Sequence, residues 1–128
     1  MIGTWLPLLI LTFLGSAMGG LCRHLLTGWI DRRANHGFPW GTLAVNTTGA
    51  FAVGMVWGLP WEVWPPVSAL GRDFLLFGFL GGYTTVSSFA LNTLDLWQND
   101  CRRRAVFNLF GTHALCLTAV FTGAAVVL

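Results

Sequence analysis

Four long runs of apolar residues, separated by short polar or proline-containing segments, dominate this chain. The runs cover about Trp5–Trp29, Gly41–Leu59, Phe74–Trp97 and Ala105–Leu128. Each approaches or exceeds the roughly 20 residues that a helix needs to cross the hydrocarbon core of a membrane. The pattern predicts an all-α membrane protein in which residues 1–128 form a single domain of four transmembrane helices.

Polar residues and prolines mark the ends of these runs. The segment Asp31–Arg33 predicts a polar loop after the first span, and Pro60 closes the second. Tryptophans and prolines within Trp61–Arg72 predict a surface connection in the headgroup layer. The first run lacks a basic segment before it and is followed by further spans, so we expect a retained membrane helix rather than a cleaved signal peptide.

The third run is interrupted by small and hydroxyl-bearing residues, from Gly81 through Ser88. This composition predicts a break in the helix near Gly81–Thr85, with the glycines supplying unusual backbone dihedrals and close approach. Carbonyls released at bilayer depth must be buried in protein or line a wet cavity. Because interrupted membrane helices often form ion sites, this segment is the first candidate for function.

Composition narrows the class of protein. Hydrophobic residues make up 55% of the chain and charged residues 9%, and the formal charge is +2. These values are typical of a membrane protein, and no basic stripe predicts a nucleic-acid partner. The sequence contains no Ser-His-Asp, Cys-His or metal-ligand constellation, so enzymatic chemistry is not predicted.

Small residues recur at intervals of four, as in Gly15 with Gly19 and in Ala50, Gly54 and Gly58. This spacing places them on one face of a helix and predicts close helix packing rather than chemistry. Four short helices enclose little interior, so an isolated subunit could hardly surround a pore. We therefore expect a homo-oligomer.

Arginines are distributed unevenly between the two predicted membrane sides. Five of them fall in or beside the first and third loops, whereas the side with both termini and the second loop carries Arg72 alone. The positive-inside rule then predicts that both termini lie outside.

Several polar residues fall inside the predicted spans. Asn46 is either a helix–helix hydrogen-bonding residue or a pore-lining donor to an anion. Asn108 and Thr112 share one face of the fourth span with Cys116, and Ser87 and Ser88 could face them from the third. A ladder of neutral donors suits an anion path, but hydroxyls can equally bond to their own helix.

Charged residues inside the spans are few. Arg23 lies well within the first span, where an arginine marks a partner or pathway unless it extends to the interface. The first, second and fourth spans have no acid near their centres. A proton-coupled exporter of organic cations needs a buried carboxylate, so this alternative is disfavoured.

Three motifs resemble the Fluc (CrcB-type) fluoride channels, which are small four-span microbial membrane proteins. They are Gly19–Arg23, Gly41–Asn46 and Gly78–Phe89. The resemblance implies an antiparallel, dual-topology homodimer with two fluoride pores and one structural sodium ion. It also implies passive export of fluoride that relieves fluoride toxicity, across the cell membrane, or across the inner membrane if the cell is Gram-negative.

The resemblance also implies roles for individual residues. Asn46 would line the pore, and Phe89 would present its ring edge to the anion. The chain has Val86 where the family usually has a phenylalanine, and Asn92 where a glutamate is common. The implied pore set is Asn46, Phe89, Val86, Ser87, Ser88, Asn108, Thr112, Thr42 and Arg23, and the implied sodium ligands are the backbone carbonyls of Gly81 and Thr84.

The leading hypothesis is therefore a fluoride channel whose partners are fluoride, membrane lipid and a second copy of the chain, without nucleic acid. The alternatives are a small multidrug-resistance-type exporter of organic cations and a non-conducting membrane scaffold. The predicted broken helix and polar ladder argue against the scaffold.

Overall fold

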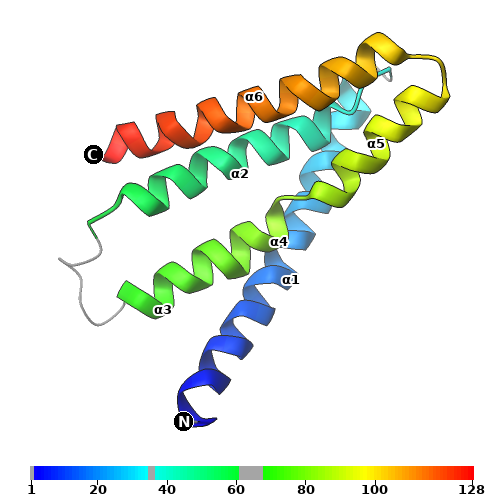
Figure 1. The fold of residues 1–128 in the computed structure, drawn as a ribbon. Coiled ribbons are helices and arrows are strands. Elements are labelled where there is room, and N and C mark those ends of the chain that lie inside the picture. The colour runs from blue at the N-terminus through cyan, green and yellow to red at the C-terminus, as the bar shows by residue number, and fades with distance from the viewer. Residues whose placement is uncertain (1, 35–36, 61–67) are drawn as a thin grey trace.

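The computed structural model describes residues 2–34, 37–60 and 68–128, and these parts of the chain are helical without strands (Figure 1). The third predicted span, Phe74–Trp97, consists of three consecutive elements, η2, α4 and α5, and α3 precedes it. The helices are α1 (Ile2–Arg33), α2 (Trp40–Gly58), α3 (Ser68–Asp73), the π-helix η2 (Phe74–Leu80), α4 (Gly81–Tyr83), α5 (Val86–Gln98) and α6 (Arg102–Val127).

Three helical stretches are long and apolar enough to cross a membrane: Trp5–Arg33, Leu70–Gln98 and Arg102–Val127. The remaining predicted span, the second along the chain, is α2, whose 19 residues correspond to about 28 Å. It carries no charged residue, and it buries six residues against its neighbours, among them Thr42 and Val45. Because neighbouring helices shield it, α2 can carry polar side chains that a lipid-facing helix could not. The all-α membrane architecture is confirmed.

Two helices begin or end beyond their predicted limits. The polar loop predicted from Asp31 is instead the last turn of α1, in which the Arg33 guanidinium lies 4.2 Å from the centre of the Trp29 ring. Basic residues are favourable there because the C-terminus of a helix carries partial negative charge. At the other limit, α6 begins at Arg102 rather than Ala105.

The predicted surface connection Trp61–Arg72 is only partly described. Residues 61–67 lie outside the described residues, and α3 begins at Ser68, so the last part of this segment is helical rather than a loop. It leads directly into η2, whose wide turns let the Gly81 N–H bond to the Leu76 carbonyl five residues earlier.

The break in the third span lies where it was predicted, at Thr84 and Thr85. Their backbone angles are extended, with φ −80° and ψ 158° for Thr84 and φ −150° and ψ 121° for Thr85. The expectation that glycines supply unusual dihedrals is wrong, because Gly81 is helical at φ −62° and ψ −36°. Close approach is the role of Gly82, where an added Cβ would lie 2.2 Å from the Ser16 carbonyl oxygen.

Glycines also mediate the two main helix contacts, as predicted. A Cβ on Gly54 of α2 would lie 2.0 Å from the carbonyl oxygen of Val120 in α6, and one on Gly19 would lie 2.0 Å from that of Phe79. Thus α2 runs beside α6, while α1 crosses the first half of the third span (Figure 1). The absence of side chains lets these backbones touch.

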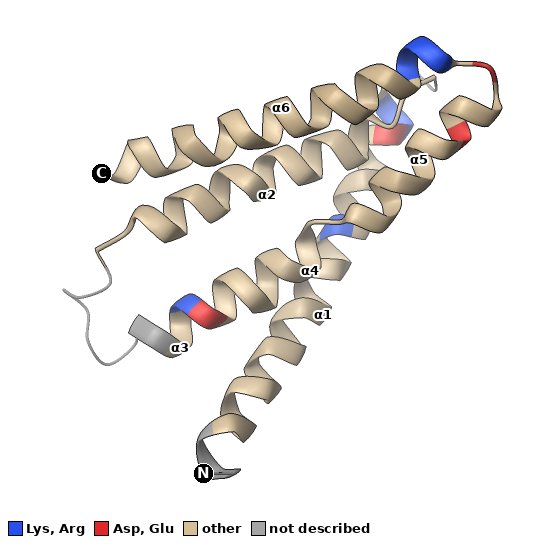
Figure 2. Cartoon of the chain, viewed as in Figure 1, with Lys and Arg blue, Asp and Glu red and all other residues tan. Residues whose placement is uncertain are grey.

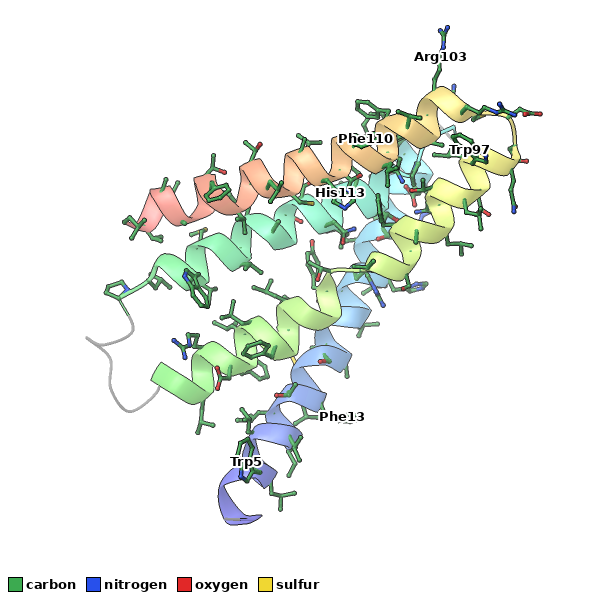
Figure 3. The ribbon with its side chains drawn as sticks, in the orientation of Figure 1. Trp5, Phe13, Trp97, Arg103, Phe110 and His113 are labelled. Atoms are coloured by element: carbon green, nitrogen blue, oxygen red, sulfur yellow. The ribbon has the colours of Figure 1, made fainter. Side chains whose placement is uncertain are left out.

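The interior of the subunit is thin. The buried apolar residues in the described part of the chain are Leu43, Val45, Leu80, Ala105 and Ala119. Large apolar side chains cover the outside; Phe13, for example, is 73% exposed and projects away from the bundle (Figure 3). Charged residues collect mainly where α1 ends and α6 begins, and long stretches of helix carry none (Figure 2). Such a surface suits lipid or a second subunit rather than water.

Candidate functional site

The site is organised by the pairing of Asn46 with the helix break. The Asn46 amide nitrogen donates to the carbonyl oxygen of Thr85 at 2.9 Å, and the Thr85 backbone N–H donates to Asn46 Oδ1 at 2.8 Å. One side chain of α2 therefore satisfies both backbone groups of Thr85. At bilayer depth these groups would be costly without partners, so Asn46 stabilises the break itself.

The hydroxyl group of Thr85 caps α5. Thr85 Oγ1 accepts the backbone N–H of Ser88 at 3.1 Å and lies 3.1 Å from Ser88 Oγ, to which it donates. Ser87 Oγ lies 3.2 Å from the same oxygen. A threonine at this position supplies the acceptor that the first turn of a helix requires, and it gathers three hydroxyls at the end of the break.

A cavity of about 260 Å³ lies beside this junction, between α2, α5 and α6. The helix break contributes part of its lining, which combines an amide, hydroxyls and an aromatic ring. We call it the Phe89 cavity. It is lined by Asn46, Ala50, Thr84, Thr85, Val86, Phe89, Thr112, His113 and Cys116.

A second hollow follows the other side of the break, between α1, α2 and α5. Two adjoining cavities of about 330 and 420 Å³ share the residues Thr27, Thr42 and Ser88. We call them together the Thr42 crevice. One part reaches Arg23 and His24, and the other reaches Asp31 and Asn92, whose amide nitrogen donates to Thr42 Oγ1 at 2.9 Å. Thr85 lines both the crevice and the Phe89 cavity.

The polar face predicted on the fourth span exists, but part of it faces a neighbouring helix. Asn108 is 2% exposed, and its amide nitrogen donates to Thr93 Oγ1 on α5 at 2.8 Å. Thr93 Oγ1 in turn donates to the Phe89 carbonyl oxygen at 2.8 Å, and Thr112 Oγ1 donates to Asn108 Oδ1 at 3.3 Å. This chain of bonds fixes α5 against α6 and holds the Phe89 turn in place.

The structure thus separates the predicted pore residues into three groups. Asn46, Val86, Phe89 and Thr112 share the Phe89 cavity. Thr42, Ser88 and Arg23 lie in the Thr42 crevice, so Ser88 does not face the polar side of α6 as expected. Ser87 and Asn108 line neither hollow.

The carbonyls predicted to bind sodium, those of Gly81 and Thr84, sit at the break. In a continuous helix they would accept the N–H groups of Thr85 and Ser88. Those two N–H groups instead donate to Asn46 Oδ1 and Thr85 Oγ1. Both carbonyl oxygens are thereby released from these helical bonds.

Sequence reasoning missed Thr85 and His113. Thr85 carried a usable signal, since a threonine that follows a break and precedes a helix favours the capping position. His113 adjoins Thr112 but is not on its four-residue ladder, and no periodicity places it in a cavity. Its position depends on how α6 is rotated against α2 and α5.

Comparison with known proteins identifies the family of this chain. The model described as CrcB-like protein, Camphor Resistance (CrcB), matches residues 10–124. Fluoride-specific ion channel FluC 3 of Brucella suis is 41% identical over 115 residues, which are 89% of this chain and 86% of that protein. Fluoride-specific ion channel FluC 2 of Rhodopseudomonas palustris is 45% identical over 116 residues, or 90% and 88%. Fluoride-specific ion channel FluC of Hahella chejuensis is 37% identical over 119 residues, which are 93% of this chain and 93% of that protein. With nearly its whole length matched, this chain belongs to the CrcB family.

Proposed function

We propose that this protein is a fluoride channel that lets the ion leave the cell down its gradient and so relieves fluoride toxicity. The observation that carries the proposal is the Phe89 cavity, which brings Asn46, Phe89 and Thr112 together at a helix break. The relatives described above bear the name fluoride-specific ion channel, and the family model matches residues 10–124, which include every residue that lines the cavity.

The cavity offers the groups that replace water around a small anion. The Asn46 amide has two N–H groups, of which one is bonded to Thr85 and the second is available to fluoride. The edge of the Phe89 ring carries partial positive character and adds a weak contact. Because conduction needs binding that is also easily reversed, a site of neutral donors suits passage better than a fixed charge would.

The Thr42 crevice supplies an approach to the same break. Arg23 places a permanent positive charge in it, and hydroxyls of Thr42 and Ser88 line its wall. Thr85 lies between the crevice and the Phe89 cavity. A cation near the entrance raises the local concentration of anions, so we assign Arg23 to attraction and Asn46 to passage.

The exporter alternative is weaker on the described residues. Their acids are Asp31, Asp73, Asp95 and Asp100, which lie toward the ends of elements rather than in the Phe89 cavity. Proton exchange for a cation requires a carboxylate at the binding site. A scaffold without conduction gives no reason for two polar hollows on either side of a broken helix.

The active form that we propose is an antiparallel homodimer. One subunit has a thin interior, and the Val86 residue beside the break is 80% exposed. A second copy would cover such apolar positions and close the open side of the Phe89 cavity. The released carbonyls of Gly81 and Thr84 fit a sodium ion, since hard cations prefer oxygen ligands. Bound there, sodium would be coordinated by the lone pairs of these carbonyl oxygens and would hold the helix breaks of the two subunits together.

Fluoride efflux from vesicles that contain the purified protein tests this function, with chloride efflux as the control for selectivity. We expect fluoride to leave far faster than chloride and protein-free vesicles to retain it. A protein that is folded and dimeric but releases no fluoride would refute the channel.

Orientation in the cell membrane, which is the inner membrane in a Gram-negative cell, is tested separately. Single cysteines placed near the chain termini, in protein freed of its native cysteines, should label from both sides in a dual-topology dimer. The arginine distribution instead predicts termini mostly outside. Labelling from one side alone would contradict the antiparallel arrangement without affecting the channel proposal.

A further inference from the structure

His113 lies in the Phe89 cavity without a role in the path described so far. His113 projects from the side of α6 that faces the Phe89 cavity and is exposed in the single subunit, whereas Phe110, one turn earlier, projects in another direction (Figure 3). The His113 and Phe89 rings meet edge to face, with centroids 5.3 Å apart and planes at 77°. An imidazole is thereby held against the aromatic ring assigned to the anion.

We propose that His113 makes the anion path sensitive to protons, so that protonation of its ring increases fluoride flux through the Phe89 cavity. This inference rests on the proposed channel function. It adds a regulatory residue to that site.

The hydrogen bond of the ring determines what its neutral form can offer. His113 Nδ1 is bonded to the Leu109 carbonyl oxygen, and because a carbonyl only accepts, Nδ1 carries the proton. A neutral imidazole has a single N–H, so Nε2 then presents a lone pair. A lone pair repels an anion, whereas a protonated Nε2 donates to it and adds a positive charge. One proton thus converts an unfavourable group into a favourable one.

No acid opposes this charge within the cavity. Of its nine lining residues, only His113 and Cys116 are titratable. The elements packed against α6 are α2, which has no charged residue, and α5, whose acid Asp95 is not among the lining residues. On α6 itself, Arg102 to Arg104 lie at least nine residues away, about 13 Å along the axis. Across Thr85, Arg23 is permanently charged and does not titrate with His113.

Fluoride efflux measured at equal pH on both sides of the membrane, between about pH 5 and 8, covers the range in which histidine changes charge. Leak through protein-free vesicles is subtracted, because hydrogen fluoride crosses bilayers unaided. We expect wild-type flux to rise about fivefold or more toward acidic pH, the scale of typical coupling between sites. In His113→Gln, which keeps a neutral polar group of similar reach, this rise should disappear.

Two matched controls isolate the residue. Cys116→Ser removes the other titratable group of the cavity, and His24→Gln removes the histidine of the Thr42 crevice; both should retain the pH response. An unchanged response in His113→Gln would overturn the inference while leaving the channel intact. Absence of wild-type flux at every pH would instead overturn the channel.

A measurement on the wild-type protein covers the case in which His113→Gln fails to form the native dimer. Fluoride should shift the ring resonances of His113, observed by NMR, more at acidic than at alkaline pH, because the protonated ring binds the anion. Equal shifts at both would overturn the inference.

Discussion

Two regions of the molecule require opposite kinds of residue: the helix crossings, where glycines of one helix contact the backbone of another, and the helix break at Thr84 and Thr85. At the crossings, Gly54 and Gly19 bring backbones together by having no side chain, with no room for a Cβ. At the break, Asn46 holds the backbone of Thr85 by two hydrogen bonds through its side chain. The comparison predicts that the crossings at Gly54 and Gly19 tolerate no added side chain, whereas the break tolerates no loss of its hydrogen bonds.

The largest loss of folded protein is expected when a bulky side chain is added where α2 meets α6. Gly54→Leu places a side chain where even a Cβ lies 2.0 Å from a backbone oxygen that cannot move aside. Overpacking commonly costs about 1–3 kcal/mol and more when backbones must separate. We expect little folded dimer in detergent, judged by size-exclusion chromatography. Gly111→Leu is the matched control, since a Cβ at Gly111 meets only the Phe107 ring at 3.5 Å and longer. Equal yields would mean that the crossing is looser than the structure indicates.

Next in size is the removal of the amide that pairs with the break. Asn46→Leu keeps the volume but leaves the N–H and carbonyl of Thr85 without their partner, at about 1–3 kcal/mol for each group. Fluoride flux and the free energy of unfolding should both fall.

Asn46→Asp separates the structural role of Asn46 from its role in the pore. The carboxylate still accepts the Thr85 N–H, loses the bond to the Thr85 carbonyl, and places a negative charge in the anion path, so flux should disappear. A folded Asn46→Asp dimer that conducts at the wild-type rate would show that Asn46 is structural only.

Two adjacent glycines sharpen the comparison within one helix. A Cβ on Gly82 would lie 2.2 Å from the Ser16 carbonyl oxygen, whereas one on Gly81 meets only the Leu76 oxygen at 3.5 Å. Gly82→Ala should lower the free energy of unfolding by about 1–3 kcal/mol, and Gly81→Ala should leave the subunit fold unchanged. Thermal unfolding in detergent compares the two. A Gly81→Ala protein that folds but fails to dimerise would support a subunit contact at the break.

The smallest loss of stability is expected at the start of α2, in the part of the Thr42 crevice that does not include Thr85. Asp31 Oδ1 accepts the Gly41 N–H at 2.8 Å and places a negative charge at the positive end of α2. Asp31→Asn keeps an acceptor but removes the charge, which should cost about 0.3–1 kcal/mol. The loss should shrink in high salt because the Asp31 carboxylate is only partly buried. A loss as large as that in Asn46→Leu would show that Asp31 belongs to the site.

The sequence alone was sufficient for the features that depend on local composition. Apolar runs predicted the helices, small residues at four-residue spacing predicted the crossings, and Thr84 and Thr85 lay within the predicted break. It could not distinguish whether Asn46 bonded to another helix or faced an anion, and the structure shows the first while leaving an amide N–H for the second. It also placed Ser88 against α6, although this residue lies in the crevice toward α1.

The open question at Asn46 and the misplacement of Ser88 have a common physical cause. A sequence sets which residues share a face of a helix, because 3.6 residues per turn is a local property. It does not set how far each helix is rotated about its axis, since that depends on which backbones can approach. Packing decided the rotation here: contact of Gly54 with Val120 orients α2 and α6, which brings Asn46, Phe89 and His113 to one cavity. The chain determined its helices and its break, and tertiary packing decided which polar groups meet there.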